Sequence, residues 1–175
     1  MRPWLLFLLI LVFFSFYANH TTIAKENNLR LFKKPTKIKG KITLPLNSRK
    51  KAQLFSDSVC LSIGVPPKLI REIGENESGW RCIQSLSGGS DYGDLQIIKS
   101  TFDHWYQKLG LEGGSSRANY LIVGIHYLKD RYNKYESWEK ARFAYARGEW
   151  LSNRNQWTAL EKKFMDKIDW QQYDQ

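Results

Sequence analysis

The 175-residue chain contains few of the residues that build metal and redox sites. It has two cysteines and only three histidines, His20, His104 and His126, which are scattered along the sequence. Neither set has the close spacing that metal-ligating side chains show. No internal repeat is visible, and the length is enough for one domain with some chain left over. We therefore expect one folded domain that uses no metal and no cofactor.

Long apolar runs are absent beyond the first eighteen residues. Trp4–Ala18 is apolar apart from one serine and follows a basic second residue. Fifteen such residues are few for a membrane span but suit the core of a signal peptide. Cleavage would follow Ala18 or Ala24; otherwise residues 1–24 remain as an uncleaved signal anchor. In either case the rest of the chain is predicted to be exported, to the periplasm or the outer face of the cytoplasmic membrane.

Acidic residues are scarce in one stretch only. Residues 25–51 carry ten Lys and Arg against Glu26 alone, a net charge of +9. Arg2 supplies the rest of the total of +10, so residues 52–175 are neutral. A neutral domain argues against nucleic acid as a partner. The basic stretch has two prolines and few aromatics and predicts an extended tether. This tether is either a solvated spacer or a contact to anionic membrane headgroups or acidic wall polymers.

Glu77 is the clearest candidate for a catalytic group. The segment Pro67–Glu77 reads as a helix in which Leu69, Ile73 and Glu77 share one face at four-residue spacing. A carboxyl held against apolar neighbours has a raised pKa, as a general acid needs. The Ser-Gly-Trp triplet that follows is a helix stop and a large aromatic, which places the carboxyl at the lip of a cleft. A capping or surface role is the alternative on this pattern alone.

Further motifs follow Glu77-Ser78 along the chain. They are Ser90–Ile97 (SDYGDLQI), a helix with Asn119, Gly124, Tyr127 and Leu128, and Ala144–Gly148 (AYARG). In this order they resemble the signature of the SLT-type lytic transglycosylases in the lysozyme-like superfamily, which include accessory enzymes of secretion, pilus and conjugation machines. The resemblance covers roughly residues 55–150. It implies a mainly α, lysozyme-like α+β fold, in which a helical lobe and a loop or small hairpin form a cleft in a catalytic domain over residues 52–175.

The resemblance also implies a substrate and a reaction. The substrate is the peptidoglycan glycan strand, cut at the β-1,4 bond between MurNAc and GlcNAc. Glu77 would act as general acid and then as base while the C6 hydroxyl of the muramic acid attacks, which gives a 1,6-anhydro end. Gln96 and Tyr145 would line the cleft, with the Tyr145 hydroxyl orienting Glu77 or the substrate. Ser78 would hold the carboxyl or the acetamido group of the sugar. An envelope secretion or conjugation machine is a further possible partner.

Two positions depart from the family pattern, and further functions stay open. Asp94 stands where the family has a leucine, and Ala146 where it has an asparagine whose amide could bond near the acid. Asp91 matches the second catalytic carboxylate of animal-type lysozymes, so a hydrolytic muramidase is one such function. Asp91 could equally bond its own backbone within a glycine-rich turn. The chain could also be a glycan-binding module without catalysis, or a structural part of an envelope machine.

Cys60 and Cys82 flank the helix that carries Glu77. In an exported protein such a pair favours a disulfide. It would close a loop of about 21 residues, contribute about 3 kcal/mol, and hold the segment after Glu77 against the preceding helix.

The remaining pattern predicts helices joined by short loops. Gly124 within an apolar helix stripe suggests that another backbone packs closely there. Residues 81–97 hold several glycines and predict loops with at most a small hairpin. The helices are expected at residues 49–63, 67–77, 100–109, 116–132, 136–147 and 153–168, with Ser100 as an N-cap and glycines at residues 64 and 110 as stops.

Overall fold

The computed structural model describes residues 45–86, 88–151 and 153–174. The chain divides into two units, Met1–Lys37 and Ile38–Gln175, and every described residue belongs to the second. The predicted targeting segment 1–24 and the tether as far as residue 44 lie outside the described residues. Within the described part, no helix has the length and apolar character that a membrane crossing requires.

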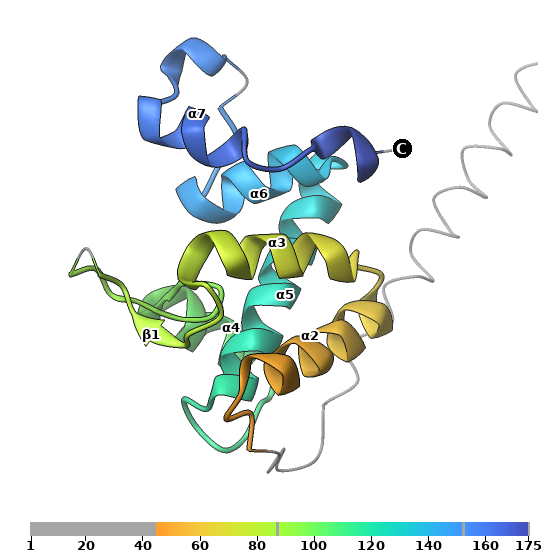
Figure 1. Cartoon of the computed structure of the whole chain (residues 1–175), viewed down its shortest axis with the longest axis vertical. Coiled ribbons are helices and arrows are strands. Elements are labelled where there is room, and N and C mark those ends of the chain that lie inside the picture. The colour runs from red at the N-terminus through yellow and green to blue at the C-terminus, as the bar shows by residue number, and fades with distance from the viewer. Residues whose placement is uncertain (1–44, 87, 152, 175) are drawn as a thin grey trace, which may run out of the picture. The chain divides into compact units, whose positions relative to one another are not determined.

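The described domain is mainly helical with one small sheet (Figure 1). In chain order its elements are α2 (Arg49–Ile63), α3 (Pro67–Ser78), β1 (Ile83–Gln84), β2 (Asp91–Gly93), β3 (Ile97–Ile98), α4 (Lys99–Leu109), α5 (Arg117–Tyr135), α6 (Trp138–Arg147), the 3-10 turn η1 (Arg154–Gln156), α7 (Ala159–Met165) and the 3-10 turn η2 (Trp170–Gln172). The three strands form an antiparallel sheet in the order β1-β2-β3, with Ile83 opposite Gly93 and Tyr92 opposite Ile97. The predicted lysozyme-like, mainly α class is confirmed.

Local signals explain most helix boundaries. Four helices begin with an N-cap residue whose side-chain hydroxyl accepts a hydrogen bond from a backbone N–H of the first turn. These N-cap residues are Ser48, Ser116, Ser137 and Thr158. Four helices end at a glycine in the left-handed region, Gly64, Gly79, Gly110 and Gly148. These caps fix the end of α3, and therefore the place of Glu77 in its last turn.

Helix α5 is the centre of the domain. It packs against α2, α4 and α6, and residues 118–125 are all buried. A Cβ at Gly124 would come within 2.8 Å of Leu95 and 3.1 Å of Ile97. The prediction that another backbone packs closely at this glycine is wrong, because the close neighbours are side chains from the loop before β3 and from β3.

Three differences from the sequence-based boundaries are the most informative. Helix α4 begins at Lys99, so Ser100 lies inside it and the N-cap position is Ile98, which has no side-chain hydrogen bond. Helix α5 continues to Tyr135 and ends at Glu136, which takes the left-handed conformation without being a glycine. The predicted helix 153–168 is divided, because the Thr158–Glu161 capping box starts α7 anew at Ala159.

The predicted Cys60–Cys82 disulfide is not formed, and both residues are free cysteines. Cys60 is buried near the end of α2, whereas Cys82 lies beyond the far end of α3. Twelve helical residues separate the two ends of α3 by about 18 Å. A disulfide requires Cα atoms within about 7 Å of each other. The disulfide prediction was wrong because it rested on the even number of cysteines and not on the distance between them.

Thiol alkylation is expected to distinguish the two cysteines. Burial raises the pKa of both thiols, that of Cys60 to about 12 with a contribution from the Asp57 charge, but Cys82 is partly exposed whereas Cys60 is buried. The native protein should take up one alkyl group, at Cys82, because the thiolate is the reactive form. In denaturant without reductant both residues should react, as counted by mass spectrometry. A protein that takes up no label in that denaturant would have the disulfide after all.

Candidate active site

A cavity of about 440 Å³ opens where six elements meet, and strand β3 is one of them. Its walls combine the end of α3, strand β2 with the loop to β3, α4, α5 and the end of α6. The residues that bear on its chemistry are Glu77, Asp91, Gln96, Thr101, Tyr127 and Tyr145. Of the predicted catalytic and binding residues, all but Ser78 are thus brought together, although they lie up to 68 positions apart in the sequence.

Glu77 occupies the last turn of α3 and is 17% exposed at its side chain. Burial raises the pKa of this carboxyl, and the charge of Asp91 adds to the rise, while Arg142 and Lys167 oppose it. The net direction is upward, as the sequence pattern predicted for a proton donor. The Trp80 side chain, which follows the helix stop, is buried against Gly74, and its indole N–H donates to the Arg71 carbonyl at 3.1 Å.

Arg142 of α6 forms an ion pair with the acid. Its Nη2 donates to Glu77 Oε1, and its side chain is fully buried. The guanidinium carbon lies 4.5 Å from the Phe164 ring centroid and 5.4 Å from that of Tyr145. A second cavity of about 230 Å³ lies on this side of Glu77 and is lined mainly by apolar side chains that include Phe164 and Met165. The acid therefore lies on the wall of two cavities.

Asp91 and Gln96 lie on the sheet side of the larger cavity. Asp91 is the first residue of β2 and is partly exposed. Gln96 takes the left-handed conformation, with φ of 48°, and its Nε2 donates to the carbonyls of Gly93 at 2.8 Å and Ile83 at 3.0 Å. Because these bonds hold the amide nitrogen in place, Gln96 gives this part of the cavity wall a fixed shape.

Tyr145 joins the α6 side of the cavity to the loop before β3. Its hydroxyl donates to the Leu95 carbonyl at 2.8 Å, and its ring lies 5.2 Å from that of Tyr127, another lining residue. Burial, followed by the charge of Glu77, raises the pKa of Tyr145 well above its usual value. The hydroxyl therefore stays protonated. Since the Leu95 carbonyl accepts its hydrogen bond, the oxygen remains available to a substrate as an acceptor.

Ser78 does not reach the cavity wall. It is buried, and its hydroxyl donates to the main-chain carbonyl of Asp94 at 2.9 Å. This bond ties the end of α3 to the loop that carries Leu95 and Gln96. The position next to the acid thus joins the two sides of the site.

Asp94 faces neither the cleft nor water. Its buried carboxylate accepts two bonds from Arg117, at 2.8 and 2.6 Å. The same guanidinium donates to the carbonyls of Leu46 at 2.6 Å and Trp80 at 3.0 Å. The charge that departs from the family pattern therefore forms an ion pair that joins the start of α5, the segment before α2 and the loop after α3.

Sequence reasoning missed Arg142. Helix α6 places Trp138, Arg142 and Tyr145 on one face at spacings of four and three residues. The two aromatic residues predict that this face of the helix is apolar, and this pattern does not explain why Arg142 lies between them. An arginine on a buried helix face is the signal that could have indicated a carboxylate partner.

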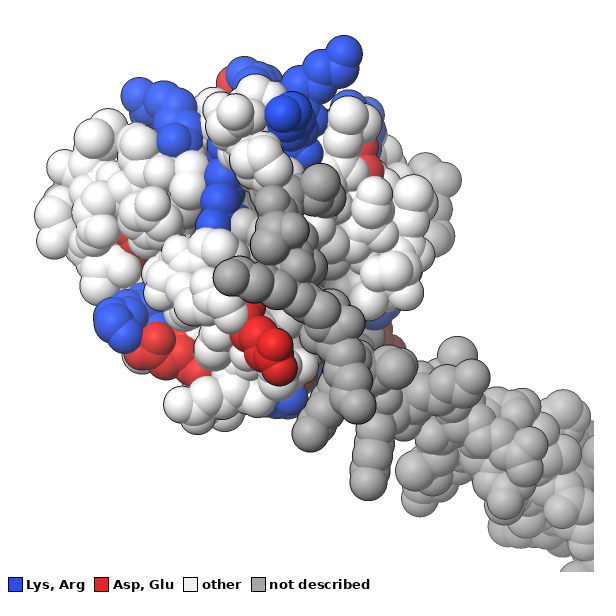
Figure 2. All heavy atoms as spheres, turned by 90° about the horizontal axis from the view of Figure 1, so that it is seen from below, with Lys and Arg blue, Asp and Glu red and all other residues white. Residues whose placement is uncertain are grey.

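The face drawn in Figure 2 carries both basic and acidic side chains and is not a patch of one charge sign. Basic and acidic side chains both occur there among larger areas of uncharged residues. This agrees with the neutral balance of residues 52–175. In the part of the chain that the structure describes, no group of three or more His, Cys, Asp or Glu residues could hold a metal ion.

Comparison with known families gives one match. The family model described as "Transglycosylase SLT domain" matches residues 61–169. Neither the curated proteins nor the solved structures gave a match. The matched range holds the whole cavity, from the helix that carries Glu77 to the segment after α7.

Proposed function

Because this chain belongs to the family of transglycosylase SLT domains, we propose that it is a peptidoglycan lytic transglycosylase with Glu77 as its general acid and base. One observation carries the proposal: a carboxyl with a raised pKa lies on the wall shared by two cavities. A glycan strand that follows both cavities has a sugar on either side of Glu77. A glycosidic bond then lies at the carboxyl.

The proposed reaction uses one carboxyl twice. Glu77 donates its proton to the glycosidic oxygen, the bond from that oxygen to C1 of the muramic acid breaks, and an oxocarbenium-like sugar forms. The C6 hydroxyl of the same sugar attacks C1, and the Glu77 carboxylate takes the hydroxyl proton. No water is consumed, so the products are a free GlcNAc hydroxyl and a 1,6-anhydro-MurNAc end. Because the nucleophile belongs to the substrate, its attack is intramolecular.

The surrounding residues support this chemistry by holding the walls. Gln96 and Tyr145 fix the sheet side and the α6 side through bonds to main-chain carbonyls. Tyr127 offers an aromatic face in the same cavity, of the kind on which sugar rings pack. We assign these three residues to substrate binding, and Ser78 to holding the loop beside them.

A muramidase is the second candidate, and Asp91 is the observation that favours it. This carboxylate shares the cavity with Glu77 and is close enough for its charge to raise the pKa of the acid. In a hydrolase it would assist water at the sugar. The family match favours the intramolecular route, which needs no second side chain to activate a nucleophile.

The substitution Asp91→Asn is expected to lower activity by less than about a hundredfold, with the anhydro product retained. The charge of Asp91 raises the pKa of Glu77, so its removal lowers that pKa. The protonated acid is then lost earlier as pH increases, and the alkaline limb of the activity profile should move to lower pH. If the variant is inactive and the wild type releases mainly reducing-end fragments, the muramidase assignment replaces ours.

For the location, we propose an exported enzyme that acts on the periplasmic or outer side of the cytoplasmic membrane. Residues 1–24 provide the export signal or anchor, and the basic tether provides the contact to anionic headgroups or wall polymers. An envelope secretion or conjugation machine is the proposed setting for this activity. Detection of the protein in the membrane fraction, released by salt after signal cleavage, tests the electrostatic contact.

Release of soluble fragments from purified peptidoglycan tests the proposed activity. The exported form of the protein should solubilise the wall, and the residual insoluble material should decline with time. Binding to insoluble peptidoglycan without any release would support the catalytically silent module instead.

A further inference from the structure

Arg142 is the most unusual charged residue of the described domain. Its side chain is fully buried, and Nε and Nη1 have no hydrogen-bond partner among the described residues. Its one bond to a side chain is from Nη2 to Glu77 Oε1. A buried guanidinium with unpaired N–H groups is costly, and a single carboxylate provides its compensation. The arrangement is therefore unfavourable for stability alone, which points to a role in the site.

Resting on the proposed function, we propose that Arg142 is the positioning residue of the acid. Its bond to Oε1 fixes the carboxyl and leaves Oε2 to carry the proton. Its charge stabilises the carboxylate during the interval after Glu77 has donated its proton and before it accepts one from the C6 hydroxyl. Such a contact gains strength when the carboxyl ionises, as catalysis requires of a group that acts within the cycle.

The departure at Ala146 fits this role. Ala146 follows Arg142 by one helical turn on α6 and lines both cavities beside Glu77. It stands where the family pattern has an asparagine that could bond near the acid. With that amide missing, Arg142 is the α6 side chain that donates a hydrogen bond to Glu77 among the described residues.

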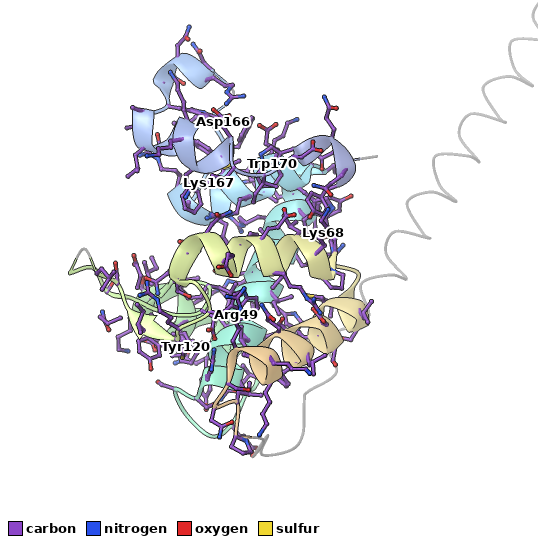
Figure 3. The ribbon with its side chains drawn as sticks, in the orientation of Figure 1. Arg49, Lys68, Tyr120, Asp166, Lys167 and Trp170 are labelled. Carbon is purple, nitrogen blue, oxygen red and sulfur yellow. The ribbon has the colours of Figure 1, made fainter. Side chains whose placement is uncertain are left out.

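The charges around Glu77 determine the sign of the effect. Arg142 from α6 and Lys167, which follows α7 (Figure 3), favour its ionised form, and Asp91 from β2 disfavours it. Arg147 and Glu161 line the second cavity and pair with each other at 2.9 Å. Without the Arg142 charge, burial and Asp91 still raise the pKa of Glu77, and of the two charges that lower it only Lys167 remains. The pKa of Glu77 must then increase.

The decisive experiment is an NMR titration of the Glu77 carboxyl carbon in full-length protein. In Arg142→Met, which keeps much of the side-chain volume, the pKa should increase, because the charge that favours the carboxylate is removed. Arg142→Lys keeps the charge and should stay near the wild type. Arg142→Gln is a second neutral variant in case the Met variant does not fold. The matched control is Arg49→Met, since Arg49 of α2 pairs with exposed Glu75 on the same helix α3 (Figure 3).

The dependence of activity on pH in the same variants is a second, independent measurement of this effect. The alkaline limb of the activity profile should move to higher pH in the neutral variants and not in Arg142→Lys or Arg49→Met. An unchanged Glu77 pKa in both neutral variants would overturn the role of Arg142 while leaving the proposed reaction intact. Absence of cleavage by the wild type would instead count against the proposed function itself, because the titration does not depend on turnover.

Discussion

Replacing Glu77 with glutamine is expected to reduce peptidoglycan cleavage by about two to four orders of magnitude, as loss of a general acid does. The amide keeps the size of the side chain and can still accept the bond from Arg142, but it has no proton of suitable acidity to give. The measurement is the rate of fragment release from purified peptidoglycan. Glu75→Gln is the matched control, because Glu75 lies on the same helix and its side chain is exposed.

The stability of this variant must be followed with its activity. Glu77→Gln leaves the buried Arg142 charge without a counterion, so the melting temperature should fall. Adding Arg142→Met should recover much of that loss without recovering activity. A folded Glu77→Gln variant that keeps more than about a tenth of wild-type turnover would remove Glu77 from the role of acid.

The second large effect is expected on folding and not on chemistry. Asp94→Leu restores the residue type of the family pattern but leaves Arg117 without its carboxylate. Removal of one partner from a buried pair costs about 3–5 kcal/mol of unfolding free energy. The Asp94 side chain is fully buried and its two bonds to Arg117 are well formed. Urea unfolding monitored by tryptophan fluorescence measures the change.

A double variant and a surface control make this test specific. Asp94→Leu with Arg117→Met should be close to wild-type stability, because an apolar pair can replace a buried ion pair. Asp103→Leu removes the exposed pair with Lys99 and should cost less than about 1 kcal/mol. If Asp94→Leu alone is as mild as this control, the ion pair does not stabilise the fold.

The helices of this fold could be predicted because their end signals are local. Gly64 ends α2 as expected, and Gly79 ends α3 one residue beyond the predicted boundary. The small sheet could not be placed, because strands of two or three residues are too short to show alternation. Helix α5 extends three residues beyond its predicted end because no local stop signal marks that end. Its last residue is followed by Glu136, which gives no glycine signal.

The site was predictable where one helix or one motif carried the information. Glu77 was identified by its spacing with Leu69 and Ile73, and Gln96 and Tyr145 by the family motifs. The partners of Asp94 and Glu77 were not predictable, since Arg117 and Arg142 lie 23 and 65 positions away. Only tertiary packing brings such pairs together. The even number of cysteines gave no information on the distance between Cys60 and Cys82, which the helix between them holds apart.

Mass spectrometry of the fragments released from purified peptidoglycan tests the central claim most directly. If Glu77 works alone and the C6 hydroxyl attacks, the muramic acid ends are 1,6-anhydro sugars, lighter by one water than the hydrolysis products. The account predicts that these anhydro ends dominate from the earliest time points. Fragments that carry mainly reducing muramic acid ends would contradict it and would identify water as the nucleophile.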